Sequence, residues 1–134
     1  MRWRWFICLL LLSNAAIWGT VAVQARGQLP QIYFFDVGQG DSQLILVNGV
    51  KILIDGGPNA AVLERLSEIL PFGDRYVDIV LLSHPHLDHF GGLIDVFKNY
   101  EVCIFIDSGF SHDTGQYKYF QELLQEKQIR RVAL

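Results

Sequence analysis

Cysteine is scarce in this chain of 134 residues, which contains only Cys8 and Cys103. Cys8 lies in an apolar N-terminal stretch, and Cys103 lies in an apolar segment with the pattern of a strand, so the two cannot pair in a folded domain. This excludes a domain held together by disulfides. We expect Cys103 to be a small buried hydrophobic side chain.

Basic clusters are almost absent as well. Arg2 and Arg4 belong to the N-terminal stretch, so the rest of the chain contains 9 of the 11 Lys and Arg residues against 14 Asp and Glu, a formal charge of −5. The one basic group, Lys127 with Arg130 and Arg131, is typical of the solvated end of a helix. No positively charged surface for nucleic acid is therefore predicted.

Charge is missing altogether from residues 5–23, which follow Arg2 and Arg4. About 20 apolar residues cross a bilayer, so residues 1–25 are interpreted as a transmembrane anchor or a secretory signal peptide. The length favours the anchor, and a weak small-residue cleavage site around residues 23–25 favours the signal. Either interpretation predicts a membrane or secreted location, with the remainder outside the cytoplasm. Residues 26–31 are a short polar linker.

The remainder, residues 32–134, predicts one domain that begins with antiparallel strands. β-branched and aromatic residues predict strands at 32–37, 42–47 and 50–54. A glycine turn at 38–41 separates the first two, and Asn48-Gly49 is a strong hairpin signal between the next two.

Helices and strands then alternate. Apolar spacing predicts a helix capped by Asn59 and running to about residue 70, and further helices at 91–100 and 116–127. Strands are expected at 77–82, buried on both faces, at 102–106 and from 131 onward. This order predicts a mixed α/β sheet covered by helices. Because the sequence ends inside a strand pattern, we expect a fragment or a truncated gene product.

The chemistry concentrates in the histidine segment, residues 84–89, which holds three of the four histidines. Pro85 favours extended backbone before it, so His84 and His86 are expected to point the same way and to share one divalent metal. Asp88 and His89 begin the next helix and are turned away from that pair, which predicts a second ion. Gly91 and Gly92 are expected to leave room for metal or substrate.

Simpler interpretations stay open. One zinc ion used as a structural staple, or histidines lining a turn, would also give a histidine-rich segment, although a staple needs four ligands closed around one ion. His112 is a further ligand or an ordinary solvated loop residue. Asp55, at the end of a strand, either supports the ligands or only forms a turn.

The motif of residues 83–92 resembles the HxHxDH signature of the metallo-β-lactamase fold superfamily. The segments Asp36-Val37-Gly38-Gln39-Gly40-Asp41-Ser42 and Ile54-Asp55-Gly56-Gly57 sharpen the likeness. Together they resemble the hydrolase domain of ComEC-type competence (DNA-uptake) proteins and their stand-alone relatives.

The resemblance implies an αββα sandwich, of which this chain holds the N-terminal half, and a site for two divalent ions, zinc first and manganese second. His84 and His86 match ligands of one ion. Asp88 and His89 match ligands of the other, with Asp88 also catalytic, next to the attacking water. Asp36, Asp41 and Asp55 are implied to lie close to the site without binding metal.

There are two departures from this pattern. Many ComEC-type members have Asp where this chain has His86. The superfamily also needs a third histidine, a bridging aspartate and a final histidine, and nothing in residues 93–134 matches them. We therefore expect an anchored or exported metal-dependent hydrolase acting on nucleic-acid phosphodiesters. An amide or ester hydrolase, β-lactams included, and a non-catalytic truncated domain remain the alternatives.

Overall fold

The computed structural model describes residues 2–24 and 29–134, so residues 25–28 of the expected leader and linker lie outside the described part. The N-terminal stretch forms helix α1 (Arg2–Gln24), whose side chains from Ile7 to Thr20 are exposed. Among the residues whose placement is described, no helix has both the length and the apolar character needed to cross a membrane.

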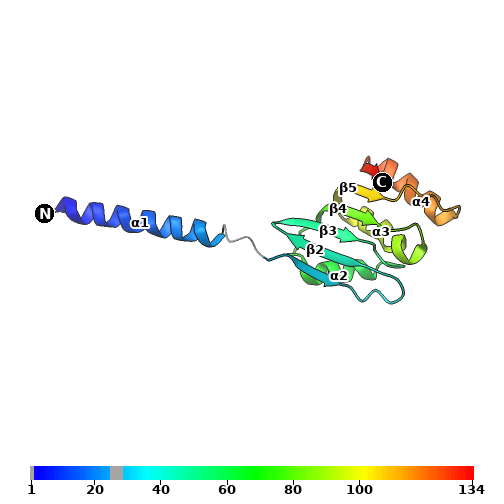
Figure 1. The fold of residues 1–134 in the computed structure, drawn as a ribbon, viewed down its shortest axis with the longest axis horizontal. Coiled ribbons are helices and arrows are strands. Elements are labelled where there is room, and N and C mark those ends of the chain that lie inside the picture. Colours follow the sequence, from blue (N-terminus) through cyan, green and yellow to red (C-terminus); the bar gives the residue numbers. More distant parts are fainter. Residues whose placement is uncertain (1, 25–28) are drawn as a thin grey trace.

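The described residues form one mixed sheet in which spatial order follows chain order (Figure 1). The first three strands pair antiparallel, and the pairs from the third strand onward are parallel. The predicted mixed α/β class is confirmed. The strands are β1 (Gln31–Phe34), β2 (Gln43–Val47), β3 (Val50–Ile54), β4 (Tyr76–Leu82), β5 (Glu101–Asp107) and β6 (Arg130–Ala133).

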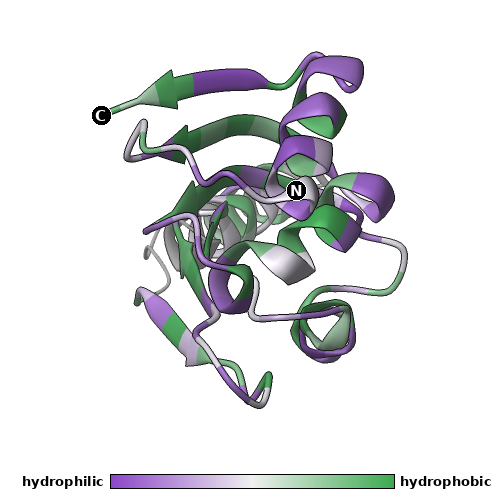
Figure 2. Ribbon diagram, turned by 90° about the vertical axis from the view of Figure 1, so that its right-hand side faces the viewer, coloured by the Kyte–Doolittle hydropathy of each residue, from purple (hydrophilic) through white to green (hydrophobic). Residues whose placement is uncertain are grey.

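Three helices cover one face of this sheet (Figure 2). They are α2 (Ala61–Ile69), α3 (Leu87–Asn99) and α4 (Gly115–Glu126). Leu53, Val80 and Phe105 are register partners on β3, β4 and β5, and all three are fully buried beneath the helices. The core therefore lies between the sheet and this single helical layer.

The opposite face of the sheet is apolar but only half-buried. Its central row joins Ile45, Ile52, Ile79 and Ile104 across four strands. The prediction that the strand at 77–82 is buried on both faces is therefore wrong for the described chain. The pattern of continuous apolar residues is present, but helices cover only one side.

The β2–β3 hairpin follows the sequence closely. Asn48 and Gly49 both have positive φ, 51° and 82°, as a type I′ turn requires. The right-handed twist of this turn matches the twist of the two strands, so the dipeptide fixes their register.

Three local expectations need correction. β1 ends at Phe34, although the Phe35 N–H still donates to the Ser42 carbonyl at 2.9 Å. Ala60, not Asn59, is the N-cap residue of α2, while the Asn59 side chain accepts from the Ala61 N–H at 2.9 Å. Cys103 is exposed and not buried, although its neighbour Val102 packs against the core.

Helix α3 begins at Leu87, which agrees with the expectation that Asp88 and His89 begin a helix and lies four residues before the apolar pattern at 91–100. Two N–H groups, those of His89 and Phe90, donate to the His86 carbonyl, each at 3.0 Å. Gly91 and Gly92 are interior positions of the helix. Asp88 and His89 consequently lie in its first turn, where the helix dipole favours an ionised carboxylate.

Candidate metal site

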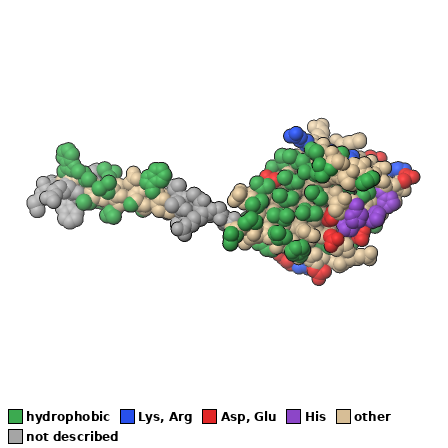
Figure 3. Space-filling model, in the orientation of Figure 1, with side chains coloured by type: hydrophobic (Ala, Val, Ile, Leu, Met, Phe, Trp, Pro, Cys, Tyr) green, Lys and Arg blue, Asp and Glu red, His purple; other side chains and the backbone are tan. Residues whose placement is uncertain are grey.

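The polar residues gather where the parallel strands end. Asp55 follows β3, the histidine segment joins β4 to α3, and Asp107 is the last residue of β5. Because the carboxyl ends of parallel strands meet at one edge of a sheet, these residues lie together. Figure 3 shows the histidine side chains grouped at one end of the domain, with acidic side chains beside them.

Asp55 connects the strand ends. Its side chain is buried, and one carboxylate oxygen accepts from the Ser83 N–H at 2.8 Å. The other oxygen accepts from the Ser83 hydroxyl at 2.6 Å and lies 2.9 Å from Nδ1 of His89. Asp55 itself has a φ of 56°, in the left-handed region that Asp adopts more readily than most residues. Its carbonyl accepts from the buried Ser42 hydroxyl at 3.1 Å.

This network assigns the ring protons of two histidines. Ser83 has one hydroxyl proton, and the Asp55 carboxylate can only accept, so Ser83 gives its proton to Asp55. Ser83 Oγ, 2.9 Å from Nδ1 of His84, must then accept from that nitrogen. Nδ1 of His89 likewise donates to Asp55. Both rings therefore carry their proton on Nδ1 and leave the Nε2 lone pair free, as metal binding requires.

His89 and Asp88 are placed to share an ion. Nε2 of His89 lies 4.0 Å from Oδ2 of Asp88. Zinc bonds to imidazole nitrogen at about 2.0–2.1 Å and to carboxylate oxygen at about 2.0–2.2 Å, which with tetrahedral angles separates two donors by about 3.4 Å, so both atoms can reach one ion if they approach each other by roughly half an ångström. His89 is buried and Asp88 partly exposed, which leaves one side of such an ion open to solvent.

His84 and His86 also lie together. Residues 83–85 form a bend in which the His86 N–H donates to the His84 carbonyl at 2.9 Å. His86 itself is extended, with φ −95° and ψ 149°, so the chain bends at Pro85 between the two histidines. The two rings nevertheless meet edge to face, with centroids 4.7 Å apart.

The glycine turn of residues 36–41 packs against the start of α3. A Cβ at Gly40 would lie 1.9 Å from the Asp88 carbonyl oxygen, so only glycine allows this approach. The Asp41 carbonyl accepts from the Gly57 N–H at 2.9 Å. The Asp36 side chain accepts from the Gly38 N–H at 3.2 Å and so shapes the turn. The Asp36 and Asp41 residues are both exposed.

Gly91 and Gly92 allow α3 to pack closely against another segment of the backbone. A Cβ at Gly91 would lie 2.3 Å from the Pro58 carbonyl oxygen, and one at Gly92 would lie 2.0 Å from that of Gly56. Their expected role of leaving room for metal or substrate is therefore wrong. They allow α3 to lie directly on the segment that follows Asp55.

The donor set suits a divalent ion in its chemistry, since imidazole and carboxylate are ligands of zinc and manganese. In the described part of the chain, no three His, Cys, Asp or Glu side chains are arranged to hold one ion. The residues therefore suit metal binding as two pairs, His84 with His86 and Asp88 with His89. An ion bound by either pair would have further coordination positions for other donors.

Sequence reasoning missed two residues of this edge. Ser83 stands directly before the histidine segment, and its position between a strand and a ligand is the signal that identifies it. Asp107 is buried, and its Oδ2 lies 2.6 Å from Arg131, which ties β5 to β6. The structure also brings His112, a residue of the loop after β5, within 5.6 Å of His86 between ring centroids.

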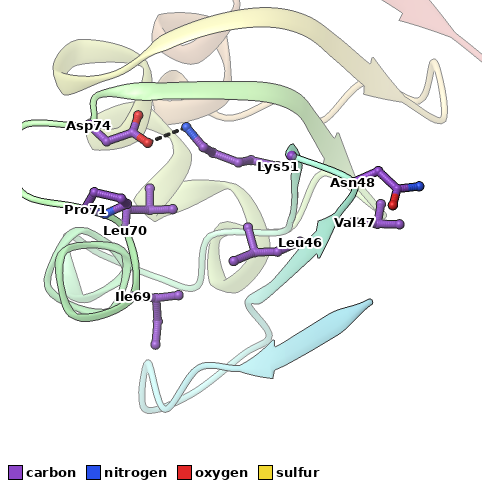
Figure 4. Close-up of a pocket in the computed structure, with 9 residues that line it drawn as sticks. Leu46, Val47, Asn48, Lys51, Ile69, Leu70, Pro71 and Asp74 are labelled. Carbon is purple, nitrogen blue, oxygen red and sulfur yellow. Dashed lines mark hydrogen bonds and ion pairs between the residues drawn. The ribbon is translucent and has the colours of Figure 1, made fainter. Parts of the chain in front are cut away.

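A separate small cavity of about 160 Å³ lies at the other end of β3 (Figure 4). The β2–β3 hairpin and the end of α2 line it, and an ion pair between Lys51 and Asp74, 2.5 Å long, closes one side. The hydrogen bond from Lys51 lowers the pKa of Asp74. This cavity contains none of the predicted site residues.

Comparison with known proteins identifies the class. The metallo-beta-lactamase superfamily domain matches residues 35–131, and the chain belongs to this family. The expected superfamily and fold are thereby confirmed.

Individual relatives are matched over part of their length. The chain is 42% identical over 69 residues to YcaI of Escherichia coli (strain K12), covering 47% of this chain and 9% of that protein. It is 39% identical over 61 residues to ribonuclease TTHA0252 of Thermus thermophilus, covering 44% and 14% respectively. The chain thus spans less than one sixth of the length of either relative.

Solved structures agree on the fold. The metallo-beta-lactamase fold protein YhfI from Bacillus subtilis matches with a TM-score of 0.54 and 21% identity, covering 80% of this chain and 46% of that one. MEM-A1, a subclass B3 metallo-beta-lactamase from a soil metagenome library, matches with a TM-score of 0.50 and 25% identity, covering 61% and 33%.

Proposed function

We propose that this chain supplies a metal-binding part of a hydrolase that cleaves phosphodiester bonds of nucleic acid. The observation that carries the proposal is the network of Asp55, Ser83, His84 and His89. It holds two imidazoles with their Nε2 lone pairs free at the edge of the sheet where β3 and β4 end. Imidazoles oriented by a carboxylate in this way are typical of metal centres.

The ligands act in pairs in this proposal. His84 and His86 hold one ion, and Asp88 and His89 hold the other, with zinc first and manganese second. Such ions supply Lewis acidity and lower the pKa of water toward neutrality when bound. Asp88 is the proposed catalytic residue because its partly exposed carboxylate, at the dipole-stabilised start of α3, can accept a proton from water.

The nucleic-acid substrate is supported by the similarity to a ribonuclease and by the sequence resemblance to DNA-uptake proteins. The acidic charge of the domain means that its own lysines and arginines contribute little to phosphate binding. Bound divalent ions would therefore provide most of the attraction for the substrate.

A second candidate function is hydrolysis of an amide or ester, β-lactams included. The likeness to MEM-A1, a subclass B3 metallo-beta-lactamase, favours it. Both candidates use the same four ligands, so the substrate and not the metal distinguishes them.

The test uses the full chain loaded with Zn²⁺ or Mn²⁺. We expect bound metal by elemental analysis, cleavage of bis(p-nitrophenyl) phosphate, and loss of that cleavage in Asp88→Asn. Nitrocefin hydrolysis without diester cleavage would select the second function. A chain that binds no metal, or binds metal without either turnover, would overturn the catalytic proposal and leave a non-catalytic domain.

We also propose, from the sequence of residues 1–25, that the chain is attached to a membrane or exported. Two arginines precede a stretch without charge, as in anchors and signal peptides. Cell fractionation with N-terminal sequencing tests this. An intact Met1 in the membrane fraction supports an anchor, a new N-terminus near residue 26 supports a signal, and an intact chain in the cytoplasm contradicts both.

A further inference from the structure

We propose that His112 is a ligand of the same ion as His84 and His86, so that three imidazoles from two loops form one site. This inference rests on the proposed function, because it extends the first of the two metal pairs. It begins from the position of the loop at residues 108–114. That loop follows β5, which lies parallel to β4, so it reaches the edge of the sheet where the histidine segment begins.

The loop is held on both sides of His112. The buried Tyr117 donates its hydroxyl to the Phe110 carbonyl at 3.1 Å. On the other side, Thr114 is the N-cap of α4, and its hydroxyl accepts from the Tyr117 N–H at 3.3 Å. The Thr114 N–H also donates to the His112 carbonyl at 3.0 Å. These contacts fix the backbone of His112 beside the histidine segment, while its side chain remains exposed.

The ring separations match a shared ion. An imidazole bound at about 2.0–2.1 Å has its ring centre about 3 Å from the ion, so two rings in tetrahedral positions lie about 5 Å apart. The centroids of His84 and His86 are 4.7 Å apart, and those of His86 and His112 are 5.6 Å apart. Both separations are close to the expected value.

The same comparison separates His89 from this set. Its ring centroid is only 3.8 Å from that of His84, which is too close for two tetrahedral ligands of one ion. Nε2 of His89 also faces Asp88. His89 therefore belongs with Asp88 on the second ion, and the remaining three histidines form the first set.

Binding requires the exposed rings to turn. No three donors converge in the described structure, but His86 and His112 are exposed, so packing does not oppose rotation of their rings. The His84 ring is held by its contact with Ser83, so the rings of His86 and His112 turn toward it to share an ion. His112 thus supplies the third imidazole of this proposed site.

The experiment follows the histidine ring nitrogens of the full chain by ¹⁵N NMR during a Zn²⁺ titration. We expect the signals of His84, His86 and His112 to move together at the first equivalent. Loss of a direct ligand in His112→Ala should weaken the affinity for this ion at least about tenfold by calorimetry, since loss of a supporting contact already costs that much. His112→Cys, which offers a thiolate, should restore most of the affinity.

Ser111→Ala is the matched control, because it changes an exposed residue of the same loop, and we expect no change in affinity. Metal binding that is equal in the native chain and His112→Ala, with the His112 signals unmoved, would overturn the inference and leave the proposed function intact. A native chain that binds no Zn²⁺ would overturn both.

Discussion

Asp55 uses both carboxylate oxygens on groups that lie about thirty residues further along the chain. It holds the Ser83 N–H and hydroxyl and the Nδ1 of His89 while it is almost completely buried. Its role follows from charge as much as from shape, because only an ionised carboxylate accepts from all three groups. Removal of that charge should therefore affect the ligands before it affects the fold.

For Asp55→Asn we expect the affinity for Zn²⁺ or Mn²⁺ to fall by about 10- to 100-fold, as for other groups that orient a metal-binding histidine. The amide has nearly the same size, so circular dichroism should show the native fold. Titration calorimetry measures the affinity. Asp41→Asn, an exposed carboxylate of the neighbouring turn, is the control and should bind as the native chain does. Equal affinities in Asp55→Asn and the native chain would contradict the role given to Asp55.

Asp74 provides a pH-dependent contribution to stability that is independent of the metal site. The hydrogen bond from Lys51 lowers the pKa of Asp74 in the folded chain, so the ionised form is favoured there. The resulting stabilisation is fully present above the ordinary pKa of an aspartate, about 3.9, and is lost as the pH falls through the lower folded value.

We therefore expect Asp74→Asn to be less stable than the native chain at pH 7, and the difference to disappear toward pH 2. Urea unfolding at a series of pH values measures it. Asp113→Asn removes a carboxylate from a fully exposed ion pair and should change stability little at any pH. A difference for Asp74→Asn that grows as the pH falls would contradict the sign.

Among single residues, the four candidate ligands of the histidine segment could be named from the sequence because they are adjacent, and Ser83 could have been named from its place directly before them. The position of Asp107 and the neighbourhood of His112 could not be predicted, because they depend on which strand ends meet. That meeting is set by the parallel pairing of β3, β4 and β5, and pairing between distant strands leaves no local pattern to read.

At the scale of elements, α3 is positioned by backbone contact. The Gly56 N–H donates to the His89 carbonyl at 2.7 Å, and the Gly92 N–H donates to the Gly57 carbonyl at 2.9 Å. These bonds join α3 to the segment after β3 on both sides of Gly91. They therefore fix the positions of Asp88 and His89 relative to the sheet. Side chains at the glycine positions would separate the two elements.

Gly92→Ala should destabilise the domain by about 3 kcal/mol or more, the upper range for overpacking, because the new methyl group meets two backbone carbonyl oxygens at 2.0 and 2.5 Å. Denaturant unfolding measures this. Gly115→Ala is the matched control, since a Cβ there has nothing within 4 Å, and we expect it to be neutral or slightly stabilising. Similar unfolding midpoints for the two variants would contradict the packing role of Gly92.

Elements whose boundaries depend on local chemistry were predicted well, and those set by tertiary contact were not. The Asn48-Gly49 hairpin and β3 lie where the sequence places them, because turn geometry fixes both. The apolar spacing placed the start of α3 at residue 91, four residues too late, whereas the position of Asp88 and His89 after a strand indicated the earlier start. Gly91 and Gly92 lie inside this helix in close contact with another backbone segment, and a sequence pattern with the helical period does not reveal that contact.

At the scale of the whole molecule, the sheet has two unlike faces. One carries the buried core beneath α2, α3 and α4, and the other presents the row of Ile45, Ile52, Ile79 and Ile104. Figure 3 shows this second face as a broad apolar surface. At its β1 edge, Ile32 is 55% exposed and Phe34 is 76% exposed. A surface of this kind at a sheet edge favours self-association.

Replacing Ile32 with Lys and Phe34 with Glu should lower the tendency of the chain to associate without loss of secondary structure. Sedimentation velocity over a range of concentrations measures association, and circular dichroism checks the fold. Phe72→Glu removes an exposed aromatic side chain outside the sheet and should not change association. A double variant that sediments as the native chain does would show that this edge does not drive association.

The closeness of the candidate ligands in sequence has a consequence for the unfolded chain. The four candidate ligands lie within the six residues from His84 to His89, so they stay close together when the domain unfolds. The unfolded chain can therefore also bind metal. An ion that binds both states shifts the folding equilibrium only by the difference between its affinities for the folded and the unfolded chain. That difference comes from Asp55 and, by our proposal, His112, which reach the segment only in the folded domain. The energetic link between metal binding and folding therefore depends on residues that are distant from the motif in the sequence.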